Sequence, residues 1–131
     1  MKKALSPILI LAFWLASWLQ AAPAQQPELY AVKIHADWCV VCKRIEPAFQ
    51  EAQAELQGQP VQFLRFDLTN DETKTASATK ARELGLTEVF EGQHKTGIIV
   101  LYDPAQKKIV EILKVNRSGH QMAEAIRQKL S

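Results

Sequence analysis

Two cysteines, Cys39 and Cys42, lie three residues apart where a predicted strand is followed by a predicted helix, and the chain has no others. A disulfide across two intervening residues closes a very short loop, so it gains little stability from loop entropy. A structural disulfide framework would use more cysteines and would link distant segments. The spacing therefore indicates a reactive pair rather than a structural one.

The hydrophobic pattern predicts a single α/β domain around this pair. Residues 29–35 predict a strand, and apolar residues recur at intervals of three and four from Val41 to Leu56, which predicts an amphipathic helix. Pro47 lies inside that helix, where it removes a backbone donor and should cause a kink. Further along the chain we expect a strand at 61–67, a helix at 71–84, a hairpin of 97–102 with 108–115, and a terminal helix after a capping box at 118–121.

This order of elements predicts a mixed sheet flanked by helices. A right-handed crossover through the first helix makes the first two strands parallel, and the hairpin adds antiparallel strands.

The first residues have the profile of a signal peptide. Two lysines precede an apolar run at 4–19, and small residues at 22–24 are suited to a peptidase cut before Gln25. We therefore expect a signal peptide at 1–24 and one domain at 25–131, which is 131 minus 24, or 107 residues. A cut after Ala21 is an alternative. A retained membrane anchor facing the periplasm is another, although the run is shorter than the roughly 20 residues that span a bilayer.

Cleavage would also remove two positive charges, Lys2 and Lys3, and no acidic residue. The formal charge would then fall from +2 to zero. A neutral mature domain argues against nucleic acid as a partner.

The positions of the two cysteines predict a different chemical role for each. At the first turn of a helix, unpaired backbone N–H groups favour a thiolate, so Cys39 is the expected nucleophile. Cys42, one turn later and more covered, is the expected resolving thiol. A CxxC pair is also half of many zinc sites, but a closed site needs four ligands. The chain offers only His35, His94 and His120 and no second CxxC, so we expect no zinc site.

The segment from Ala36 to Lys43, Ala-Asp-Trp-Cys-Val-Val-Cys-Lys, followed by Pro47, resembles the active site of thioredoxins. It is most similar to the carboxy-terminal thioredoxin-like domain of DsbD, the bacterial transporter that carries reducing electrons to the periplasm. Residues 66–71 are similar to the segment after the next strand of that domain. The resemblance covers residues 29–131, weakly beyond Gly85. It implies a thioredoxin fold with a minimal βαβαββα core, no cofactor, and protein disulfides or dithiols as substrates.

The resemblance also suggests functional roles for the residues that flank the cysteines. Trp38 would pack beside the sulfurs and shape a docking surface, and Pro47 would bend the helix, although each could serve packing alone. Lys43 would raise the local positive potential, or it could be an ordinary solvated lysine.

The chain departs from the family at two positions. Thioredoxins often have a buried acidic residue six positions before the first cysteine, where this chain has Lys33. Glu46 or solvent could then move protons, and Lys33 could simply reach solvent from an edge of the strand. The family's cis-proline loop, which faces the cysteines and binds the substrate backbone, corresponds to Thr96 and Gly97. Glycine can still supply unusual backbone angles.

The link from Leu86 to Thr96 is longer than is usual in the family. One hypothesis is a remodelled substrate-facing loop with Phe90 as a contact. The alternative is a solvated loop with Phe90 in the core.

Together these features predict a monomeric periplasmic thiol-disulfide oxidoreductase. The absence of histidine between the cysteines and the resemblance to DsbD favour a reductant or electron carrier, with a membrane electron donor of the DsbD type as partner. A copper chaperone that uses both thiolates and His94 is the first alternative, since soft thiolates suit Cu(I). A binding module with an idle disulfide is the second.

Overall fold

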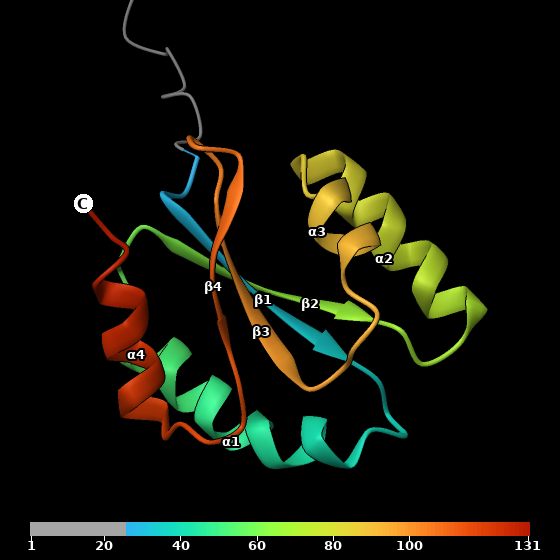
Figure 1. The fold of residues 1–131 in the computed structure, drawn as a ribbon, viewed down its shortest axis with the longest axis horizontal. Coiled ribbons are helices and arrows are strands. Elements are labelled where there is room, and N and C mark those ends of the chain that lie inside the picture. The colour runs from blue at the N-terminus through green and yellow to red at the C-terminus, as the bar shows by residue number, and fades with distance from the viewer. Residues whose placement is uncertain (1–25) are drawn as a thin grey trace, which may run out of the picture.

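The computed structural model describes residues 26–131, and the predicted signal peptide at 1–24 lies outside the described residues. In the described part, a central sheet separates two helical layers (Figure 1). The elements are, in order, β1 (Leu29–His35), α1 (Val40–Glu55), β2 (Val61–Asp67), α2 (Asp71–Leu84), α3 (Thr87–Gly92), β3 (Ile98–Asp103), β4 (Lys108–Leu113) and α4 (Gly119–Arg127). No helix in this part of the chain is long and apolar enough to cross a membrane.

The sheet has the order β2-β1-β3-β4. β1 pairs with β2 in parallel and with β3 antiparallel, and β3 and β4 form an antiparallel hairpin. This is the predicted mixed sheet, and β1 occupies its interior. Because β1 is central, six of its seven residues are buried.

Two apolar clusters cover the two faces of the sheet. Leu29 and Ala31 of β1 point toward α1 and α4, and alternate residues such as Val32 and Ile34 pack in the cluster that contains residues of α2 and α3. Successive strand residues face opposite sides, so one buried strand supplies both cores. Lys33 follows Ala31 on the α1 side.

The helix ends follow local capping signals. Asn70 and Ser118 each form a capping box at the start of α2 and α4, and Gly85 ends α2 in the left-handed conformation with φ of 73°. α1 continues through Pro47, which has no N–H to donate to the carbonyl one turn earlier.

Candidate functional site

The two cysteines lie at the junction between β1 and α1, as expected. Cys39 is the N-cap residue of α1, and Cys42 lies in its first turn. They form a disulfide, with their Cα atoms 5.2 Å apart. Cys39 retains 7% of its surface exposed and Cys42 none, so only Cys39 is open to a partner.

The helix start presents a donor to the outer sulfur. The backbone N–H of Cys42 donates to Cys39 Sγ at 3.1 Å. In the reduced protein this N–H and the positive end of the helix would favour a thiolate at Cys39. Cys42 Sγ lies on the inner side, 3.7 Å from the carbonyl oxygen of Ile34.

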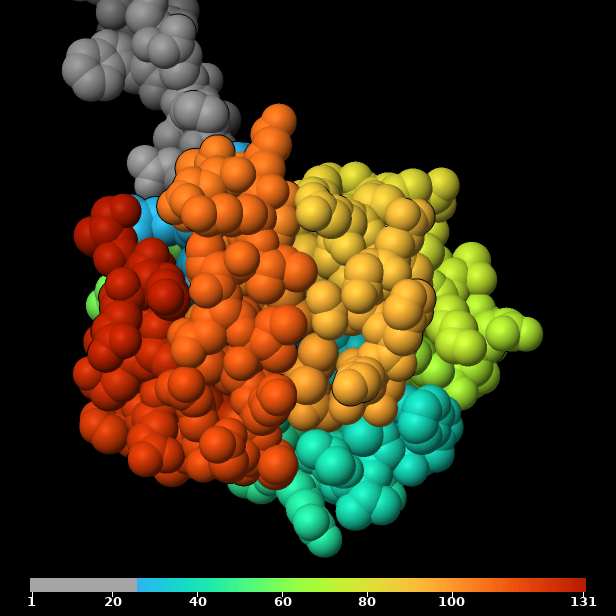
Figure 2. Space-filling model, in the orientation of Figure 1, coloured from blue at the N-terminus to red at the C-terminus, as the bar shows by residue number. Residues whose placement is uncertain are grey.

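The loop before β3 faces the cysteines, as expected for Thr96 and Gly97. Figure 2 shows this segment against the start of α1. Gly97 has φ of +81°, and its N–H donates to the Ile34 carbonyl at 2.8 Å. A Cβ atom at Gly97 would lie 2.7 Å from Val41 Cγ1 and 3.4 Å from the Cys42 backbone nitrogen. The backbone therefore approaches the CxxC helix so closely that this loop requires glycine.

Trp38 is exposed and held by a loop from a neighbouring strand. Its side chain is 65% exposed, and its indole Nε1–H donates to the Thr69 carbonyl at 3.2 Å. The Thr69 hydroxyl accepts from the Asp37 N–H at 2.9 Å, and it donates to the Asp67 carboxylate. Thr69 thus fixes the segment before Cys39 to the end of β2.

The sequence reasoning did not identify Thr69 as a site residue. The available signal was the run of polar residues at the end of β2, because parallel strands such as β1 and β2 end at the same edge of the sheet. At this edge His35 Nε2 lies 3.0 Å from Asp37 Oδ1, and His35 Nδ1 is buried without a partner. Burial raises the pKa of Asp67, but hydrogen bonds from Thr69 and the nearby charge of His35 outweigh it, and the net pKa is lowered.

Lys33 does not reach solvent, so the alternative of a solvated lysine is wrong. β1 lies between β2 and β3, and Lys33 is 0% exposed. Its ammonium forms an ion pair with the Glu46 carboxylate, which also pairs with Arg65. Glu46 is therefore held by two cations.

Lys43 and Pro47, the two remaining residues that the resemblance singled out, lie on the outer surface of α1. Lys43 and Pro47 are exposed. Within residues 26–131, no ion pair includes Lys43. Both residues are close to the cysteines in the sequence, but in the described part of the chain the structure shows no contact that assigns either of them a role.

The segment from Leu86 to Thr96 is only partly a loop. It contains α3, a helix that the sequence analysis missed. The Phe90 ring is partly buried and packs edge-on against Phe66, with centroids 5.7 Å apart. Phe90 also lines a groove, so it takes part in both the core and a surface feature.

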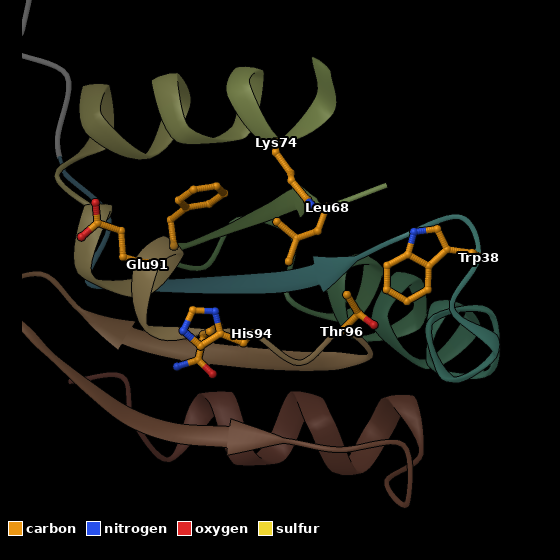
Figure 3. Close-up of a pocket in the computed structure, with 8 residues that line it drawn as sticks. Trp38, Leu68, Lys74, Glu91, His94 and Thr96 are labelled. Atoms are coloured by element: carbon orange, nitrogen blue, oxygen red, sulfur yellow. The ribbon is translucent and has the colours of Figure 1, made fainter. Parts of the chain in front are cut away.

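This groove begins at Trp38, the residue before Cys39, and has a volume of about 520 Å³. Its floor and walls come from β1–α1, α2, α3 and the loop before β3, with Trp38 toward one end and Glu91 toward the other (Figure 3). The lining residues are Trp38, Leu68, Lys74, Phe90, Glu91, Gln93, His94 and Thr96.

His94 lies in this groove but does not complete a metal site with the cysteines. In the described range, two groups of three potential ligands have their atoms within 4.8 Å of one another, and neither contains a cysteine or His94. They are His35–Asp37–Asp67 and Glu55–His120–Glu124. This arrangement gives no support to the copper alternative.

The fold and the paired cysteines define a thioredoxin-fold dithiol protein. A family profile described as Thioredoxin matches residues 16–100, more than half of the chain, and the protein belongs to that family. Family membership and the Cys39–Cys42 pair support a thiol-disulfide oxidoreductase in general terms.

Two similar solved structures with TM-scores above 0.5 agree on the fold. Thioredoxin-2 of the malaria parasite, described as a component of its protein secretion machinery, is 17% identical, with a TM-score of 0.53 over 80% of this chain and 86% of that one. A thioredoxin of Malassezia sympodialis is 16% identical, with a TM-score of 0.52 over 79% and 78%. The oxidised thioredoxin of Plasmodium falciparum is 20% identical, with a TM-score of 0.49 over 81% and 85%. No curated protein sequence matches the chain significantly.

Proposed function

We propose that the protein is a periplasmic thiol-disulfide oxidoreductase that reduces protein disulfides, with Cys39 as nucleophile and Cys42 as resolving thiol. The observation that carries this assignment is the asymmetry of the pair. Cys39 keeps 7% of its surface exposed and accepts the N–H of Cys42, whereas Cys42 is 0% exposed. An external disulfide can therefore approach only the first sulfur.

The exchange proceeds in two displacements. The Cys39 thiolate attacks one sulfur of a partner disulfide, a mixed disulfide forms, and the other partner sulfur leaves as a thiolate that takes a proton from solvent. Cys42 then loses its proton and attacks Cys39 Sγ. The Cys39–Cys42 disulfide forms, the second partner thiolate leaves, and two electrons have passed to the partner.

The direction and location rest on sequence features. Val40 and Val41 separate the cysteines, without the histidine of strongly oxidising members, and the segment resembles the DsbD domain. Export by residues 1–24 would place the domain at 25–131 in the periplasm, where a membrane donor of the DsbD type could reduce it again. We propose that it acts there as a monomer.

The groove beside Trp38 is the proposed contact for the protein partner. It is open, it is lined at one end by Trp38, the residue before Cys39, and Trp38, Phe90 and Leu68 give it an apolar lining. Thr96 lies at the same end as Trp38 in Figure 3, so a partner segment bound along the groove would pass close to Cys39.

Trapping tests the assignment of the two cysteines. Cys42→Ala should hold partners on Cys39 as mixed disulfides that a reductant releases, whereas Cys39→Ala should capture none through the buried Cys42. Equal capture by both variants would contradict the assignment. A redox potential of the Cys39–Cys42 couple of about −120 mV, rather than about −270 mV, would contradict the reducing direction.

A further inference from the structure

Lys33 is a positive side chain enclosed on the face of the sheet that α1 covers. It is 0% exposed, and its strand neighbours in register are Arg65 on β2 and Ile99 on β3. Lysine is almost never fully buried unless it is paired. Here its partner is the carboxylate of Glu46, which comes from α1.

The charges around Lys33 do not cancel. The charged groups that face it are Glu46 from α1 and Arg65 from β2, and the neutral Gln50 of α1 donates to Glu46 at 3.0 Å. We call Lys33, Glu46 and Arg65 the Lys33 cluster. Two cations share one carboxylate, so the cluster has a net charge of +1. Arg65 pairs with Glu46 Oε1 and Lys33 with Oε2, so the single carboxylate neutralises neither cation fully, and Lys33 is the buried one of the two.

One member of this cluster, Glu46, lies about one helical turn from the resolving thiol. Glu46 follows Cys42 by four residues on α1, so both occupy the same side of the helix, roughly 6 Å apart along its axis. From the strand side, Cys42 Sγ lies 3.7 Å from the carbonyl oxygen of Ile34, the residue next to Lys33. Both Cys42 and Lys33 are fully buried, and charges interact more strongly in such an interior than in water.

We propose that Lys33 is a positioning residue of the dithiol centre, whose buried ammonium stabilises the Cys42 thiolate and so speeds its attack on the mixed disulfide at Cys39. This rests on the proposed function, because it concerns the second displacement of that exchange. The Cys42 proton passes to water, the Cys39–Cys42 bond forms, and the partner thiolate leaves. Lys33 keeps its proton throughout.

The contacts of the cluster favour this role over a proton acceptor at Glu46. Its carboxylate is already held by Lys33 and Arg65, which disfavours its protonation. Burial, together with the charge of Arg65, lowers the pKa of Lys33 to about 8, so the ammonium still predominates at neutral pH. Burial of Cys42 opposes its thiolate, and the nearby cation offsets that cost.

The second displacement can be followed alone in a single turnover. The reduced full-length protein is mixed with 5,5′-dithiobis(2-nitrobenzoate): Cys39 releases the first thionitrobenzoate, and Cys42 releases the second. The rate of the second release is measured against pH for the wild type, Lys33→Met, Lys33→Gln and Lys33→Arg. Lys80→Met, which removes an exposed lysine of α2, is the control for loss of one charge.

Both neutral variants should slow the second release about tenfold at neutral pH and shift its pH profile upward, with a smaller change in the first release. Lys33→Arg and Lys80→Met should stay within about twofold of the wild type. Lys33→Gln retains a donor for Glu46 and keeps the test valid if Lys33→Met does not fold. Unchanged second-release rates in a folded neutral variant would overturn the inference.

Failure of both neutral variants to fold while Lys33→Arg folds would also overturn it, since Lys33 would then be a structural ion-pair partner. Failure of the proposed function looks different. In that case the wild type itself would release only one thionitrobenzoate.

Discussion

Gly97 provides a direct test of how closely the loop before β3 approaches the cysteines. Its φ of +81° and the position of Val41 each oppose any larger residue. In Gly97→Ala, the new Cβ would meet Val41 Cγ1 at 2.7 Å and Val41 Cβ at 2.9 Å. The Cγ1 methyl can rotate toward solvent, but Cβ cannot move without the helix backbone. Alanine at Gly97 should therefore strain both the loop and α1.

The expected loss combines two costs. A non-glycine residue at positive φ costs about 1–2 kcal/mol. Forcing one extra carbon into a packed contact costs about 1–3 kcal/mol. The free energy of unfolding should therefore fall by about 2–5 kcal/mol. Gly85→Ala isolates the first cost, because Gly85 also has positive φ, at 73°, but a Cβ there would meet nothing within 4 Å.

Urea denaturation of the oxidised proteins measures these differences. Val41→Gly also removes the Val41 Cβ, so in the Gly97→Ala background a double-mutant cycle should report favourable coupling of about 1 kcal/mol or more, separate from the cost of Val41→Gly alone. A Gly97→Ala loss no larger than that of Gly85→Ala, together with coupling below about 0.5 kcal/mol, would refute the close approach described here.

Three further predictions concern charge and packing. Burial lowers the pKa of Lys33 from 10.5 to about 8, so between these pH values the unfolded chain binds more protons than the folded protein. In urea titrations of the oxidised proteins, the stability of the wild type relative to Lys33→Met should therefore rise by roughly 1–3 kcal/mol as pH rises through this window. A difference that stays constant with pH would contradict this. Thr69→Val should raise the lowered pKa of Asp67, seen by NMR titration, and should cost about 1 kcal/mol at neutral pH. The share of this cost that comes from Asp67 should disappear as pH falls through the pKa of the folded state, while the share from the lost acceptor of the Asp37 N–H should persist; a cost that does not change with pH would contradict the Asp67 contribution. In urea unfolding, Phe90→Ala should lower the free energy of unfolding by about 2–3 kcal/mol, because it removes the contact with Phe66, and Phe90→Leu should lower it less. Equal losses in the two variants would exclude a contribution from the ring contact.

The elements with strong local signals were predictable from the sequence. The alternating pattern of residues 61–67 and the glycine after Leu84 placed β2 and the end of α2 correctly. α3 was missed because its six residues span less than two turns, too few to show a helical period, and they end in Gly92. Its identity as a helix depends on tertiary packing of Val89 and Phe90 against the sheet.

The site was predictable where neighbouring residues in sequence define it. The CxxC pair at a strand-to-helix junction fixed the positions of Cys39 and Cys42. The surroundings of Lys33 were not predictable, because Glu46 is 13 residues away and the lysine sits on a strand whose central place in the sheet emerges only from pairing. The same holds for Thr69, which reaches Asp37 across 32 residues.

The helical form of α3 bears on how the protein would discriminate among partners. A flexible rim would have to be ordered by each partner, and the entropy cost would weaken every complex. Here the Phe90 side of the groove is already fixed by its contact with Phe66, and the Phe90 N–H donates to the Leu86 carbonyl at 3.0 Å. The protein itself would lose little conformational entropy when a fitting partner binds, and a partner that does not fit could not reshape the wall. Selectivity would then appear in how long a complex persists rather than in how fast it forms.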